Sequence, residues 1–111
     1  MLWMSFFSRT VLMIAAYSGN VECVRMLLAA GADVNAAYDG WTALMSAASK
    51  GKIECVKLLI DAGADLNHKD RHNYSALYYA AYHGHFRCVS LLRSAGAEGR
   101  YQADLITPRK F

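Results

Sequence analysis

Residues 41–67 read WTALMSAASKGKIECVKLLIDAGADLN, and this stretch matches the chain again when it is moved by one period in either direction. The matching motifs recur three times at spacings of 32 or 33 residues. They are the Ala-Ala pairs at 15–16, 47–48 and 80–81, the Cys-Val pairs at 23–24, 55–56 and 88–89, and the Gly-Ala pairs at 31–32, 63–64 and 96–97. A fixed period of roughly 20–50 residues indicates an architecture of stacked repeats.

Each period carries the local signals of two helices separated by a turn. In the middle copy, the hydroxyl of Thr42 is suited to cap a helix. Gly51 is suited to end it, because a residue without a side chain readily adopts the left-handed conformation. A second helix is predicted from Lys52-Ile53 to Gly63, with its apolar side chains on one face. The polar residues that follow favour an exposed turn, so each repeat is predicted to be a helix, a turn, a second helix and a protruding loop.

The period also predicts how the chain is divided. Residues 1–9 form an apolar head or partial cap, and residues 10–111 form the repeat domain. We place its repeats at about 10–39, 40–72 and 73–104, with a partial repeat at 105–111 that contains Thr107-Pro108. A signal peptide at residues 1–9 is disfavoured because no positive residue precedes the apolar run. A fragment of a longer repeat array remains an alternative.

Composition narrows the classes of function. A chain of 111 residues fits one domain, and its net charge of +3 is well below that of a dedicated nucleic-acid binder. No apolar run approaches the ~18 residues of a membrane span.

The repeated motifs resemble those of the ankyrin-repeat family over roughly Thr10 to Thr107. The resemblance rests on three in-register copies of the Ala-Ala, Gly, Val-x-x-Leu-Leu and Gly-Ala pattern, and it implies an all-α solenoid of stacked helix-turn-helix units with protruding β-turn loops. The family's Thr-Pro-Leu-His start is degenerate here, because the second copy reads Thr42-Ala43-Leu44-Met45 and only Thr107-Pro108 keeps the proline.

The sequence offers no pattern of catalysis, cofactor binding or metal binding. Cys23, Cys55 and Cys88 hold equivalent places in successive repeats, where we expect buried free thiols of an intracellular protein. The four histidines lack the spacing of a zinc site, and we expect them to be solvated or structural. We therefore predict a protein that is not an enzyme and that uses no cofactor.

The resemblance places partner binding on the concave side, formed by the loop tips and the exposed edge of each first helix. Aromatic and cationic residues there are of the types enriched at binding hot spots. We predict the partner-binding residues to be Tyr17, Ser18, Tyr38, Asp39, Trp41, Ser49, Lys50, Lys69, Arg71, His72, Tyr74, Tyr82 and His83. Tyr78 and Tyr79 are expected to be buried in the helix packing instead.

The primary hypothesis is a non-catalytic protein–protein interaction module, monomeric and cytoplasmic or otherwise intracellular, that binds an extended or acidic segment of a partner protein. An accessory or inhibitory subunit of an enzyme is an alternative. A groove for single-stranded nucleic acid is a weaker alternative, because the net charge is small.

Overall fold

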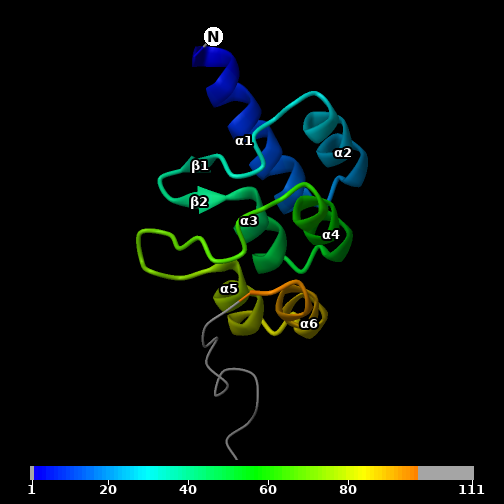
Figure 1. The fold of residues 1–111 in the computed structure, drawn as a ribbon, viewed down its shortest axis with the longest axis vertical. Coiled ribbons are helices and arrows are strands. Elements are labelled where there is room, and N and C mark those ends of the chain that lie inside the picture. Colours follow the sequence, from blue (N-terminus) through cyan, green and yellow to red (C-terminus); the bar gives the residue numbers. More distant parts are fainter. Residues whose placement is uncertain (1, 98–111) are drawn as a thin grey trace, which may run out of the picture.

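The repeats form two parallel columns of helices, with a set of loops on one side (Figure 1). The computed structural model describes the backbone of residues 2–97 and the side chains of residues 10–97. The first helices of successive repeats pack in one column, and the second helices pack in the other. The first column holds α1 (Leu2–Ser18), α3 (Ala43–Ser49) and α5 (Ala76–Tyr82), and the second holds α2 (Val21–Ala29), α4 (Ile53–Asp61) and α6 (Phe86–Ser94).

Capping groups set the ends of the helices at the predicted places. The backbone N–H of Met45 donates to Oγ1 of Thr42 at 3.3 Å, and the backbone N–H of Tyr78 donates in the same way to Oγ of Ser75 at 3.3 Å. Gly51, which follows the C-cap of α3, has a φ of +69°, as a residue that ends a helix requires. The helix-turn-helix unit predicted from the sequence is thus formed in the described residues.

The core lies between and within the two columns and is built from the repeated apolar positions. The three Ala-Ala pairs are buried, and small side chains there allow neighbouring helices to approach closely. Cys55 and Cys88 are also buried, which raises the pKa of both thiols. Cys23 is only half-buried, so the prediction of three buried cysteines holds for two of them. All three are free.

Helix α1 is longer than the other first helices because it starts at Leu2 rather than near Thr10. The predicted boundary between an apolar head and the repeats therefore falls inside one continuous helix. The described part of the structure leaves out the side chains of residues 1–9. It also leaves out residues 98–111, which include the predicted partial repeat at 105–111. The division of the chain into domains stays a prediction.

The loops between repeats have the geometry of tight hairpins. Strands β1 (Ala37–Tyr38) and β2 (Trp41–Thr42) pair antiparallel, with Tyr38 opposite Trp41. Their two-residue turn, Asp39-Gly40, has φ values of +57° and +82°, the geometry that Asp-Gly favours. In the next loop Asp70 and Tyr74 are joined by a backbone hydrogen bond of 2.9 Å across three residues. This extra loop residue explains why that repeat spacing is 33 residues rather than 32.

The close approach of the two loops at Gly40 gives a first prediction. A Cβ added there would lie 3.1 Å from the backbone nitrogen of Arg71, whereas a Cβ at Gly31, whose φ is also positive, would meet nothing within 4 Å. We expect Gly40→Ala to lower the free energy of unfolding by about 1 kcal/mol more than Gly31→Ala. Both alanines are strained by the positive φ, but only the alanine at position 40 also overlaps the neighbouring loop. Urea denaturation of the two variants measures the difference, and equal losses would mean that the loops are not in contact.

Candidate functional site

Three tyrosines form a stacked row on the exposed side of the third repeat. Tyr78 and Tyr82 are four residues apart and lie on the same face of α5, and Tyr74, which precedes the N-cap Ser75, stacks on Tyr78. The ring centroids of Tyr74 and Tyr78 are 3.9 Å apart at an interplanar angle of 7°, and those of Tyr78 and Tyr82 are 5.9 Å apart at 17°. We call these three residues the tyrosine row. The prediction that Tyr78 is buried was wrong, because its ring stacks between its two neighbours and stays partly exposed.

Tyr79 points away from the row and joins α5 to the loops. Its ring is edge-on to that of Trp41, with centroids 5.0 Å apart, and its hydroxyl donates to the carboxylate of Asp70. Burial and this hydrogen bond raise the pKa of Tyr79. Tyr79 is half-buried rather than fully buried, but it packs against the core at the edge of a cleft, so the expectation that it contributes to the packing holds.

Asp70 organises the second loop and was not among the predicted site residues. Its Oδ1 accepts hydrogen bonds from the backbone N–H groups of His72 at 2.9 Å and Tyr74 at 3.0 Å. Desolvation raises the pKa of this carboxyl, but the hydrogen bonds from Tyr79, Tyr74 and His72 outweigh it and leave the pKa below its usual value. Asp70 is therefore a fixed negative charge at neutral pH.

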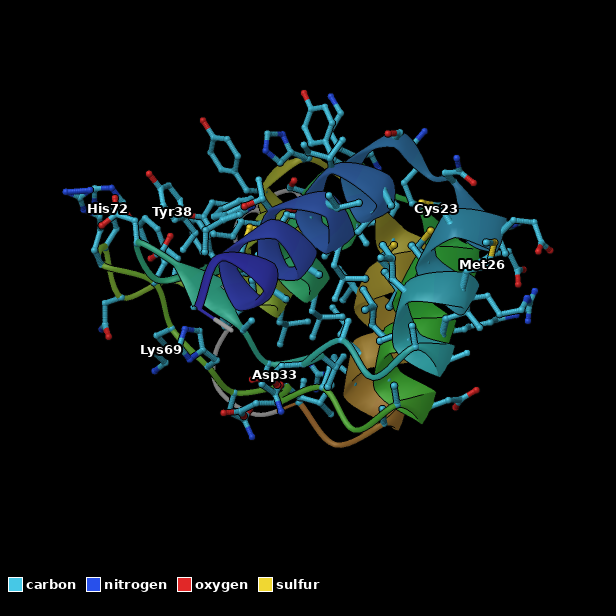
Figure 2. All side chains as sticks on the ribbon, turned by 90° about the horizontal axis from the view of Figure 1, so that it is seen from above. Cys23, Met26, Asp33, Tyr38, Lys69 and His72 are labelled. Carbon is cyan, nitrogen blue, oxygen red and sulfur yellow. The ribbon has the colours of Figure 1, made fainter. Side chains whose placement is uncertain are left out.

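A cleft of about 440 Å³ lies between the two loops, within the usual size of small-ligand pockets. We call it the interloop cleft. It is lined by Tyr38, Asp39, Trp41, Asp70, Arg71, His72 and Tyr79. Figure 2 shows Tyr38 and His72 together at the loop tips, across the molecule from Cys23 and Met26 of α2.

Two contacts join the two loops. The guanidinium of Arg71 forms an ion pair with Asp39, and Nε2 of His68 lies 3.1 Å from the carbonyl oxygen of Gly40. Trp41 contributes to the packing, because it is half-buried and its Nε1 donates to Oγ of Ser46 at 2.6 Å. Five predicted site residues thus line one cleft, namely Tyr38, Asp39, Trp41, Arg71 and His72.

The remaining predicted residues lie outside the cleft. The ammonium of Lys50 is 5.0 Å from the ring centroid of Tyr17, and the ring of His83 is edge-on to Tyr82 with centroids 5.1 Å apart. The hydroxyls of Ser18 and Ser49 donate to backbone carbonyls of their own helices, so both side chains have a structural role. Lys69 is exposed but does not line the cleft.

Within residues 2–97, no group of three or more His, Cys, Asp or Glu side chains is placed to hold a metal ion. None of the helices in that range is long and apolar enough to cross a membrane.

Comparison with known families agrees with the fold. Residues 12–103 match a family model described as ankyrin repeats (3 copies). A comparison with curated proteins finds no match. The predicted all-α solenoid is confirmed, with one short two-stranded hairpin added to it. The chain belongs to the ankyrin-repeat family.

Proposed function

We propose that this chain binds an extended segment of a partner protein along the tyrosine row and the interloop cleft. Ankyrin repeats are generally protein–protein interaction modules, and the family is typically non-catalytic. We further propose that the binding face consists of the tyrosine row and the interloop cleft, and that the bound segment is extended.

The observation that carries the proposal is the exposure of the stacked aromatic surface. Tyr82 is 58% exposed and Tyr74 is 38% exposed, although each could bury a large area. Tyr17, near the end of α1, and Tyr38, in β1, are further exposed tyrosines, at 53% and 56%. Contiguous exposed aromatic surface of this kind marks interaction sites, and tyrosine is enriched at hot spots because it buries much area at a small entropic cost.

The shape of the face favours an extended ligand. The tyrosine row runs along α5 and meets the interloop cleft at its Tyr74 end. There the ring centroids of Tyr74 and Tyr79, which lines the cleft, are 5.9 Å apart. A narrow strip of aromatic rings ending in a cleft suits one strand of chain better than a broad globular surface. The predicted acidic character of that segment stays a prediction, supported by exposed Lys69 and by Lys50 above Tyr17.

The test compares a variant of the tyrosine row with a control variant that loses an exposed side chain elsewhere on the surface. Tyr74→Ala/Tyr82→Ala removes both ends of the row, whereas Met26→Ala removes a side chain that is 65% exposed on α2, away from the proposed face. We expect a partner captured from cell extract by the wild-type chain to be retained by Met26→Ala. The double variant should bind it about 30-fold more weakly in titration of the purified pair, because truncating a hot spot costs ~2 kcal/mol or more.

Circular dichroism melting of both variants provides the control for folding. Unchanged partner affinity in a folded Tyr74→Ala/Tyr82→Ala variant would refute this face. Titration with a labelled single-stranded oligonucleotide tests the nucleic-acid alternative, for which affinity should fall steeply with added salt. Tight, salt-sensitive oligonucleotide binding that depends on the tyrosine row would replace the protein-binding proposal.

A further inference from the structure

The charges that line the interloop cleft do not balance. Asp39 and Asp70 contribute two carboxylates, and Arg71 contributes the single guanidinium among the lining residues. Asp70 is held ionised by hydrogen bonds from Tyr79 and from the backbone of the loop. The lining therefore holds two carboxylates and one guanidinium, so one carboxylate has no guanidinium partner among these residues.

The walls of the cleft are aromatic. Tyr38, Trp41 and Tyr79 come from three different segments, namely β1, β2 and α5, and all three contribute to its lining. The face of an aromatic ring attracts a cation within about 6 Å of its centroid, and the attraction grows as the cation leaves water. Aromatic walls and an excess negative charge in one cleft are complementary to an organic cation with an apolar stem.

We propose that the interloop cleft binds the cationic side chain of a lysine or arginine residue of the partner segment. This rests on the proposed function and specifies what the partner presents at one end of the tyrosine row. The alkyl stem lies against the rings, and the charged head reaches Asp39 and Asp70. An acidic side chain fits less well, because two carboxylates in the lining repel it and only one guanidinium attracts it.

The ion pair at the mouth of the cleft does not block this ligand. The side chains of Arg71 and Asp39 are 60% and 61% exposed. An exposed pair of this kind is weak because water competes for both charges. Asp39 can therefore accept a second cation, or exchange its partner, at little cost.

The experiment is a titration with small probes, followed by the indole N–H signal of Trp41 in nuclear magnetic resonance spectra. The probes are the Nα-acetyl amides of arginine, lysine, Nε-trimethyllysine, norleucine and glutamate, and the buffer is held at pH 8, where an ordinary histidine is neutral. We expect saturable shifts with the cationic probes, with dissociation constants on the order of 1–10 mM, and none with norleucine or glutamate. The relative affinities of arginine, lysine and trimethyllysine identify which cationic head the cleft prefers.

Two variants test the role of the carboxylates. Asp39→Asn keeps the left-handed turn, because asparagine tolerates a positive φ, and it should weaken cation binding by roughly two- to fivefold, the range for an exposed ion pair. Asp70→Asn should have the same effect through a different residue, so a folding defect in either variant leaves the other as a test. Asp61→Asn, an exposed carboxylate at the end of α4 that does not line the cleft, is the control for net charge and should bind the probes as the wild type does.

The outcomes separate this inference from the proposed function. Equal shifts with glutamate and lysine probes, or cation binding unchanged in both Asp39→Asn and Asp70→Asn, would overturn the cation site. If the cation site fails while the Tyr74→Ala/Tyr82→Ala variant still loses the partner, the protein-binding face stands without it. If the probes bind as expected but the partner is retained by that variant, the cleft assignment holds and the proposed function falls.

Discussion

Leu59→Ala is expected to lower the free energy of unfolding by about 2–5 kcal/mol, the usual range for a leucine truncated in a rigid core. Leu59 is 0% exposed in α4, the helix that packs between α2 and α6 in the second column. The substitution removes buried apolar atoms and leaves a cavity that helices on both sides cannot easily fill. A domain of this size has a total stability of only about 5–15 kcal/mol, so the loss is a large fraction of it.

The neighbouring residue provides the matched control. Leu58 lies in the same helix but is only half-buried, so Leu58→Ala removes the same atoms with a smaller cavity. Urea denaturation followed by circular dichroism gives the free energy of unfolding of both variants. A loss in Leu59→Ala no greater than in Leu58→Ala would contradict the position of Leu59 in the core.

The second large effect is expected from a side chain that is too big. Ala48→Leu should lower the free energy of unfolding by roughly 1–3 kcal/mol, because added methyl groups force the surrounding helices apart. Ala48 is 0% exposed in α3, which packs against both α1 and α5. The added side chain therefore strains the first column in the middle of the stack.

Substitution of an exposed alanine by leucine is the control, because it adds the same side chain without an overlap. Ala29 lies in α2 and is exposed, so Ala29→Leu should change stability by less than about 0.5 kcal/mol. Melting temperatures of the two variants are measured under the same conditions. Equal melting temperatures for Ala48→Leu and the unmodified chain would show that α3 is not tightly packed on its neighbours.

The repeated features of the fold could be predicted from sequence because each recurs and acts locally. The capping hydroxyl of Thr42 and the left-handed Gly51 depend on a few neighbouring residues, and both are found as predicted. The burial of Cys55 and Cys88 follows from their equivalent positions on the second helices. Cys23 is the exception, since the equivalent place in α2 is only half-buried.

The site was less predictable because it depends on contacts between segments. Asp70 accepts from Tyr79, nine residues away, and the Arg71–Asp39 pair joins loops 32 residues apart, so no local pattern reveals either. The spacing of Tyr78 and Tyr82 predicts that they share a face of α5, but Tyr74 precedes the N-cap Ser75, so helical spacing alone does not predict that it stacks on Tyr78. The helical pattern predicts a buried Tyr78, whereas the structure buries Met45 at the matching place of the second repeat and leaves Tyr78 partly exposed.

Tyr78 and Met45 occupy matching places in two repeats, so the repeats share their packing residues but differ in the residues that they expose. Ala47-Ala48 and Ala80-Ala81 are interchangeable, so a duplicated copy of the middle repeat would dock on its original through the same small side chains. It would bring Met45 rather than another stacked tyrosine, and the array would lengthen without gaining a second row. A stack lengthened by such copies would therefore keep a single tyrosine row, however many repeats were added.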